Sequence, residues 1–244
     1  MKRKRIITRR QALITGISSL GAALMLPGCS KELPPTYGSI LRMGDNFTYI
    51  AQRSLLPGQA LAREYRHADI SSFPATGTTN PSKFSEDYAK LLSNSFEDYR
   101  LPIEGHVSKP GSYSLTDLMK FDRRSQITKH TCEEGWTAIA EWTGVPLGTI
   151  LQHAGILPSA RFILFHTFDE WLDSIDMMDA FHPQTMIAYG MNGKTLPIQH
   201  GAPVRLRVET QIGYKSIKYI RKIEVSDKFV DYGEDTGWAW YTGI

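Results

Sequence analysis

The sequence is poor in cysteine and lacks the short motifs of the commonest cofactors. Its 244 residues hold two cysteines, Cys29 and Cys132, so no framework of disulfides is available. Neither G-x-G-x-x-G nor a P-loop occurs, and a nucleotide cofactor therefore has no support. The patterns C-x-x-C-H and H-E-x-x-H are also missing. Beyond residue 28 we find no membrane-length hydrophobic run, internal repeat or heptad pattern.

The first 28 residues resemble an export signal. Six basic residues lead into an apolar stretch from Ala12 to Leu26, and the run from Thr8 to Leu13 contains the Arg9-Arg10 pair of a twin-arginine signal. We therefore predict a periplasmic protein, exported in the folded state. A basic nucleic-acid patch is the alternative, but the apolar stretch directly behind the pair disfavours it.

Two kinds of processing remain open at the end of this signal. Leu26-Pro27-Gly28-Cys29 resembles a lipoprotein cleavage site, which would leave a lipid anchor at Cys29 as the one membrane contact. Ordinary cleavage nearby would leave a soluble product. Residues 1–28 hold six of the 28 Lys and Arg residues and none of the 25 Asp and Glu residues, so the remainder carries a net charge of −3. A nucleic-acid partner is therefore not expected.

The remaining chain is predicted to form one α+β domain. Residues 29–98 are read as an irregular wrapping segment with short helices at Gln59–His67 and Phe84–Ser93, and residues 99–244 as the main body. Strands and short helices alternate there without βαβ spacing, which favours mixed sheets over a doubly wound fold. The predicted strands are Tyr99–Val107, Ser125–Thr131, Trp136–Trp142, Arg161–Phe168, Thr185–Tyr189 and Pro203–Glu209, and Ser216–Val225 is predicted to be a final strand or helix-strand element.

Cys132 is the central candidate for chemistry. It lies between two predicted strands and has no disulfide partner once the signal is removed. Glu133 and Glu134 follow it, and neighbouring carboxylates raise a thiol pKa, whereas a metal ion deprotonates the thiol. We therefore predict a metal ligand. The alternatives are a buried apolar cysteine and a hydrolase that pairs Cys132 with His130 or His166.

Several stretches together resemble the molybdopterin domain of the sulfite oxidase family, and more closely its exported bacterial branch, the methionine-sulfoxide reductase catalytic subunits. They are Thr131-Cys132-Glu133-Glu134-Gly135-Trp136 with Trp142-Thr143-Gly144-Val145-Pro146-Leu147, Phe181-His182-Pro183, the run from Leu196 to Arg205, and the run from Gly213 to Lys218. The resemblance extends from Leu101 to about Val225.

This resemblance implies a molybdenum-molybdopterin cofactor, with Cys132 as both metal ligand and catalytic residue. A thiolate suits such a soft site. The family's cofactor contacts fall on Asn80, Thr167, His200, Arg205, Ser216, Ile217 and Lys218. Arg205 and Lys218, with the Ser216 hydroxyl and the Ile217 main-chain N–H, would supply donors to the pterin and its phosphate. His166 and Asp169 flank Thr167 and are expected near the pocket.

Two departures from the family's patterns bear on the substrate. Sulfite oxidases follow the cysteine with a Gly-Asn-Arg run, where this chain has Glu133-Glu134-Gly135. Carboxylates at that place disfavour a dianion. His200, by contrast, is the residue that sulfite oxidases tend to have, while reductases tend to have Asn.

The predicted function is two-electron oxygen-atom transfer, as reduction of an S-oxide or N-oxide, small or protein-bound. Sulfite oxidation and a degenerate, cofactor-free binding protein are the alternatives. The chain has no haem motif, so we expect an external electron partner, such as a membrane haem protein or a cytochrome. The chain is expected to be a monomer.

Overall fold

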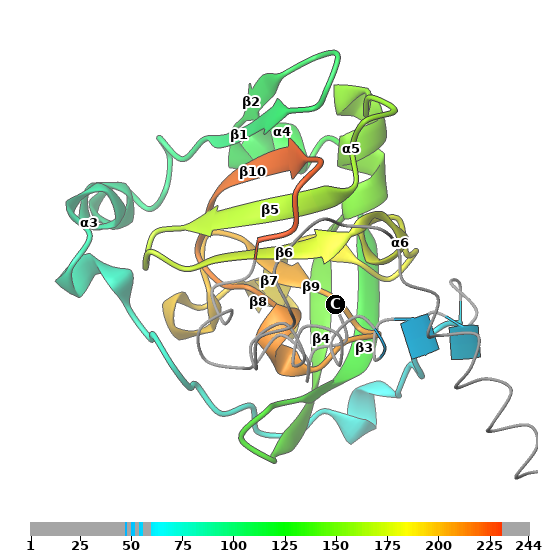
Figure 1. The fold of residues 1–244 in the computed structure, drawn as a ribbon. Helices are drawn as coiled ribbons and strands as arrows, with labels where there is room; N and C mark the ends of the chain where they lie inside the picture. The colour runs from blue at the N-terminus through cyan, green and yellow to red at the C-terminus, as the bar shows by residue number, and fades with distance from the viewer. Residues whose placement is uncertain (1–46, 48–49, 52–53, 56–59, 231–244) are drawn as a thin grey trace, which may run out of the picture. The chain divides into compact units, whose positions relative to one another are not determined.

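The computed structural model describes residues 47, 50–51, 54–55 and 60–230, all within the unit Leu41–Ile244. The predicted export signal and Cys29 lie outside these residues. Within the described part, ten strands form two sheets, and short helices lie between them (Figure 1). The prediction of an α+β fold is confirmed, and one of the two sheets is mixed. Among the described helices we find none with the length and apolar character needed to cross a membrane.

The first sheet, sheet B, is mixed. Its order is β2-β1-β10-β5-β6, and β1 and β10 are parallel while the other neighbours are antiparallel. Its strands are β1 (Leu101–Gly105), β2 (Gly111–Tyr113), β5 (Phe162–Thr167), β6 (Leu172–Asp176) and β10 (Ile220–Ser226). The short strands β2 and β6 are additions to the predicted set. Ile103 pairs with Ile223, and Ile223 with Phe165, so apolar side chains align across the centre of the sheet.

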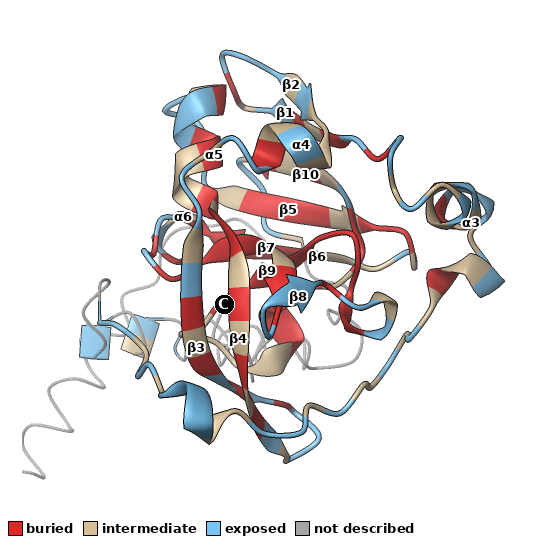
Figure 2. Ribbon diagram, turned by 180° about the vertical axis from the view of Figure 1, so that it is seen from behind, coloured by how far each residue is buried: buried red, intermediate tan, exposed pale blue. Residues whose placement is uncertain are grey.

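The second sheet, sheet A, is antiparallel and carries the predicted metal ligand. Its order is β3-β4-β7-β8, with β9 paired to β7. Its strands are β3 (Arg124–Thr131), β4 (Thr137–Pro146), β7 (Met186–Met191), β8 (Lys194–Thr195) and β9 (Arg205–Arg207). Figures 1 and 2 show β3 and β4 running across the direction of β5.

Local signals in the sequence explain the described helices. They are α3 (Glu86–Ser93), α4 (Leu115–Leu118), α5 (Leu147–Ala154) and α6 (Met177–Ala180), with 3-10 turns η1 (His67–Asp69), η2 (Pro81–Lys83), η3 (Ile198–His200) and η4 (Gly213–Lys215). Ser114 and Asp117 form a capping box at the start of α4. Gly155 ends α5 with φ of 70°, a conformation that glycine adopts at little cost.

The predicted helix over Gln59–His67 is wrong. Its described residues are extended, apart from the 3-10 turn that begins at His67. Glu64 bridges to Thr128, and the Tyr65 N–H donates to the Ile127 carbonyl at 2.8 Å. The segment thus covers the free edge of β3. Tertiary pairing with an open strand edge overrides a weak local helix preference.

The core lies between the sheets and α5, and Figure 2 shows buried residues concentrated on β4, β5, β7 and β9. A smaller apolar cluster contains Trp142, Met186 and Ala188 of sheet A. Phe73, from the segment that precedes η2, packs against this smaller cluster. The irregular N-terminal segment therefore contacts sheet A near two sites, the end of β3, which Cys132 follows, and the start of β9 at Arg205.

Candidate active site

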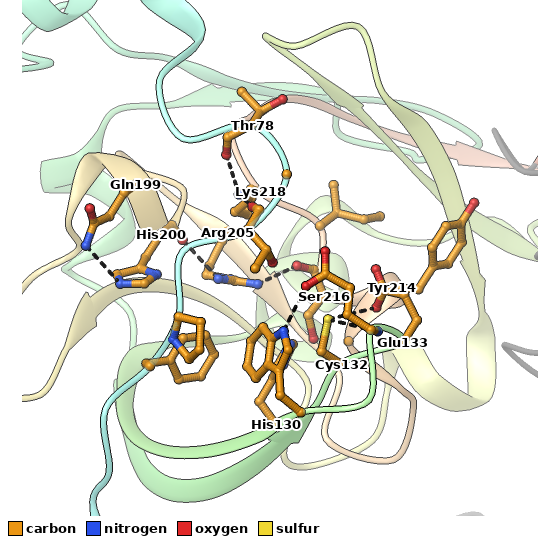
Figure 3. Close-up of a pocket in the computed structure, with 18 of the residues that line it drawn as sticks. Thr78, His130, Cys132, Glu133, Gln199, His200, Arg205, Tyr214, Ser216 and Lys218 are labelled. Carbon is orange, nitrogen blue, oxygen red and sulfur yellow. Dashed lines mark hydrogen bonds between the residues drawn. The ribbon is translucent and has the colours of Figure 1, made fainter.

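Six of the eight predicted site residues line one cavity of about 210 Å³ (Figure 3). They come from three places that are distant in sequence: the end of β3, the η3–β9 segment, and the loop between η4 and β10. These six residues are Cys132, His200, Arg205, Ser216, Ile217 and Lys218.

Cys132 lies in a tight connection between β3 and β4. Its N–H donates to the Trp136 carbonyl at 2.9 Å, and the Gly135 N–H donates to the Cys132 carbonyl at 3.1 Å. Gly135 has φ of 92°, in the left-handed region that favours glycine. These bonds fix the thiol at the end of a rigid hairpin. The Cys132 side chain is buried but lines the cavity.

Burial is the main perturbation of the Cys132 thiol. It raises the thiol pKa to about 11, with a smaller contribution from Glu133, while the Glu134 N–H bond to the sulfur lowers it. Burial of Cys132, and not the neighbouring carboxylates emphasised by the sequence, is therefore the main cause of the raised thiol pKa. Glu133 Oε2 lies 3.5 Å from Cys132 Sγ. Burial thus disfavours the thiolate when no metal is bound, which argues against a free nucleophile, whereas a bound metal ion would deprotonate the thiol.

Arg205 is the most deeply placed cation of the cavity. Its Nη1 donates to the His200 carbonyl at 3.0 Å and its Nη2 to the Ser216 carbonyl at 2.6 Å. These bonds tie η3 to the loop after η4. Burial, and then the neighbouring Arg207, lower the pKa of Arg205 to about 9. Its Nε is buried without a hydrogen-bond partner.

Lys218 is the second cation of the cavity and is half-buried, and its side chain begins close to that of Arg205, beside Gly201. Its Nζ donates to the carbonyls of Thr76, at 2.8 Å, and Thr78. Figure 3 shows Thr78 above Lys218, with the labelled Arg205 below. Burial, and then Arg205, lower the pKa of Lys218 to about 8.

Two glycines permit the close packing of these segments. A Cβ on Gly213 would lie 2.4 Å from His130 Nε2, so η4 can rest against the end of β3 only with glycine there. A Cβ on Gly201 would lie about 3.0 Å from the Lys218 side chain. Gly201 also has φ of 108°. Both glycines belong to the motifs that the sequence singled out.

The pairing of buried cations distinguishes the cavity from the rest of the core. Arg207 pairs with Glu209 at 2.8 Å and Lys215 with Asp173 at 2.7 Å, all four side chains being at most 1% exposed. Within the described part of the chain, Arg205 and Lys218 have no carboxylate partner. Burying an unpaired charge is costly. The cavity therefore fits an anionic group, which the phosphate of molybdopterin supplies.

The donor set also fits the metal of that cofactor. Among the described residues no group of three His, Cys, Asp or Glu side chains could hold a metal ion together. Cys132 lines the cavity, and its thiol would suit a metal whose other ligands include dithiolene sulfurs. His130 lines the cavity as a neutral side chain, since burial lowers its pKa to about 2, and its Nδ1 lies 2.7 Å from Arg207 Nη1.

Two predicted residues do not line the cavity. Asn80 accepts a hydrogen bond from the Ser82 N–H and caps η2. Thr167 holds the turn between β5 and β6, because the Trp171 N–H donates to its Oγ1 at 2.8 Å and Asp169 Oδ1 lies at 2.6 Å. Asp169 and Trp171 line the cavity in its place. His166 instead pairs with Glu224 at 2.8 Å.

The sequence analysis did not assign several lining residues. Phe73, Pro74, Thr76, Gly77 and Thr78 come from the segment read as irregular, where no motif distinguished them. Trp136, Gln199 and Tyr214 lay inside recognised motifs without an assigned role. Their proximity to Cys132 is decided by the fold.

The cysteine on the cavity wall and the two cations without a carboxylate partner among the described residues fit a molybdopterin site. Residues 89–232 match the family described as the oxidoreductase molybdopterin binding domain, and the chain belongs to this family. It is therefore a molybdenum-dependent oxidoreductase with molybdopterin as its cofactor.

Two relatives are similar to the chain over most of its length. The chain is 32% identical over 237 residues, 96% of its length and 87% of the relative's, to an Azospira oryzae protein with the provisional name of a protein-methionine-sulfoxide reductase subunit. It is 30% identical over 254 residues, 95% of its length and 73% of the relative's, to the protein-methionine-sulfoxide reductase catalytic subunit of Xanthomonas campestris pv. campestris.

A solved structure shares the fold. The sulfane dehydrogenase SoxCD from Paracoccus pantotrophus is similar with a TM-score of 0.54 and 28% identity. The match covers 57% of this chain and 40% of that chain. The chain thus corresponds to less than half of the sulfane dehydrogenase chain.

Proposed function

We propose that this chain is an exported reductase of S-oxides, with methionine sulfoxide in proteins as its substrate class. The observation that carries the proposal is the charge next to the expected metal ligand. Cys132 lies in the family's cofactor site, and the residues that follow it are the carboxylates Glu133 and Glu134 and not a cation. The printed names of relatives matched over most of the chain support the same reaction.

The chain's own residues would hold and orient the cofactor. Cys132 would ligate the metal, and Arg205, Lys218, Ser216 and the main chain at Ile217 would bind the anionic end, with His200 beside them. The cofactor supplies the two-electron oxygen-atom transfer chemistry. The protein keeps the site partly buried and fixes the thiol on the β3–β4 hairpin. Asn80 and Thr167 would help to position the pterin indirectly, because Asn80 caps η2 and Thr167 holds the turn between β5 and β6.

The charges at the mouth of the cavity favour a neutral substrate. Glu133 and Glu134 are exposed lining residues, and Glu133 reaches the thiol. Two unit charges 7 Å apart at an effective dielectric of 20 interact by about 2 kcal/mol, and exposure reduces this to on the order of 1 kcal/mol. A sulfite dianion meets this repulsion with each carboxylate, whereas a sulfoxide, which has no net charge, does not.

Reduction of a sulfoxide to a thioether and water consumes two electrons and two protons. We propose that the electrons come from a separate haem or cytochrome partner. The names of the relatives, which describe them as subunits, support such an assembly. We also propose export by the twin-arginine route, with lipidation of Cys29 as the alternative to a soluble product.

One assay pair tests the reaction. The cofactor-loaded protein is given methionine sulfoxide in a peptide, dimethyl sulfoxide or trimethylamine oxide with a reduced dye, and separately sulfite with ferricyanide. We expect oxide reduction to dominate. Glu133→Gln with Glu134→Gln should raise sulfite oxidation by roughly tenfold, while the exposed control Glu97→Gln should not. Efficient sulfite turnover without any oxide reduction would overturn the proposal.

A further inference from the structure

A short segment of the N-terminal region crosses the cofactor cavity. We call residues 71–78 the strap. Its start is fixed on β4, because the Ser71 N–H donates to the Ile139 carbonyl at 3.0 Å and the Ile139 N–H to Ser71 Oγ at 2.9 Å. Its end leads into η2, which Asn80 caps. Between these anchors the strap contributes Phe73, Pro74 and 76–78 to the cavity wall.

Phe73 is the apolar anchor of the strap. Its ring centroid lies 5.1 Å from that of His130, 5.6 Å from Trp136, 5.4 Å from Trp142 and 5.4 Å from His200. The contacts with Trp136, Trp142 and His200 are edge-on and the one with His130 is tilted. Edge-on aromatic contacts at such distances each add about 0.5–1.5 kcal/mol beyond the area that they bury. Trp142 also lies under Arg205, whose guanidinium carbon is 5.1 Å from its ring centroid. Phe73 therefore bridges the aromatic residues near Cys132 to those near the buried arginine.

Lys218 connects the strap to the anion site. An ammonium has three donor hydrogens. Two of them are directed at the strap carbonyls of Thr76 and Thr78, and the Tyr219 hydroxyl donates to Thr78 as well, at 3.0 Å. One donor of Lys218 is left for an anion in the cavity. Carbonyl groups orient the ammonium without neutralising it.

We propose that the strap is a structural part of the cofactor site, with Phe73 as its positioning residue, and that it closes over the bound cofactor. An anion at the remaining donor of Lys218 would hold the ammonium in the orientation in which it donates to the strap carbonyls. A closed strap in turn holds the ammonium toward the cavity. Because coupling between two binding events is reciprocal, the cofactor stabilises the closed strap and the strap slows loss of the cofactor. This inference depends on the cofactor and not on the direction of the reaction.

Hydrogen exchange on the unaltered mature protein is the first test. Amides of residues 71–78 should exchange at least about tenfold more slowly in the cofactor-loaded form than in protein produced without pterin synthesis. Residues 101–105 of β1 serve as the internal reference. Equal strap exchange in the two forms would overturn the proposal, whatever any variant does.

The second test measures release of the pterin. Phe73→Ala should lose cofactor roughly tenfold faster than the wild type, and Phe73→Leu should restore part of the retention. Phe84, which is 62% exposed and lies outside the strap, provides the matched control Phe84→Ala. Equal release from Phe73→Ala and Phe84→Ala would refute the role of Phe73. If Phe73→Ala retains sulfoxide reduction per bound cofactor, the proposed function stands independently of the strap.

Discussion

Replacing Lys218 with methionine should empty the cofactor site without unfolding the chain, whereas the same replacement of Lys215 should destabilise the fold. Both lysines are buried or nearly so, and they lie three residues apart. Lys215 has a buried carboxylate partner, Asp173, while Lys218 donates to main-chain carbonyls. The two variants therefore remove the same positive charge, in one case from an ion pair and in the other from a site where no carboxylate of the described residues neutralises it.

The magnitudes follow from the partners. Lys215→Met removes the cation from a fully buried ion pair, which typically costs about 3–5 kcal/mol. For a domain of this size that corresponds to a melting temperature lower by roughly 6–20 °C. Lys218→Met loses two hydrogen bonds, but it also removes a charge whose pKa burial lowers from 10.5 to about 8. That shift represents about 3 kcal/mol, so the two effects on the cofactor-free chain nearly offset.

Cofactor retention should respond in the opposite order, with the larger loss in Lys218→Met and the smaller in Lys215→Met. A charge-assisted hydrogen bond is worth roughly 1.5–3 kcal/mol, so Lys218→Met should weaken retention about tenfold to a hundredfold. Thermal melts of the cofactor-free proteins and pterin content per protein of the loaded ones measure the two effects. Normal loading of Lys218→Met, or a loss of stability equal to that of Lys215→Met, would refute the anion-site assignment.

Three further outcomes are expected. Cys132→Ser should abolish activity and molybdenum retention yet leave the fold intact, and an active variant would contradict ligation by this thiol. Because its folded pKa is below its unfolded pKa, Lys218 destabilises the cofactor-free chain at pH below about 8; stability should rise between about pH 8 and 10.5, and Lys218→Met should remove that rise in urea titrations. Arg9→Lys with Arg10→Lys should retain folded, loaded protein in the cytoplasm, as fractionation would show; mature protein in the periplasm would indicate another export route.

The sequence determined those features that depend on local chemistry. The cap at Ser114 and the turn glycine Gly155 fixed helix ends, and apolar runs located the central strands. The thiol at Cys132 and the motifs around His200, Arg205 and Lys218 could be identified from the sequence because a cofactor site requires particular side chains. Six of the eight predicted residues consequently meet in one cavity.

Tertiary structure alone decided the contribution of the N-terminal segment. Glu64 and Tyr65 are extended because β3 offers a free edge, which no periodicity of that segment reveals. Phe73 is one aromatic residue in a run rich in Ser, Thr and Pro, and its role arises from rings contributed by β3, β4 and η3. Thr167 was predicted to contact the cofactor; it bonds to Asp169 and Trp171 of the next turn, and these two residues line the cavity.

The buried and half-buried cations also show which features the sequence determines and which the tertiary structure decides. The sequence supplied the charges of Arg205, Arg207, Lys215 and Lys218 as four similar cations. The fold buried Arg207 and Lys215 in ion pairs with carboxylates, whereas Arg205 and Lys218 line the cavity and form no ion pair with any carboxylate of the described residues. Pairing depends on distance and desolvation, which a linear sequence does not contain. Residue types therefore indicated the cofactor, and three-dimensional pairing identified which cations are available to bind it.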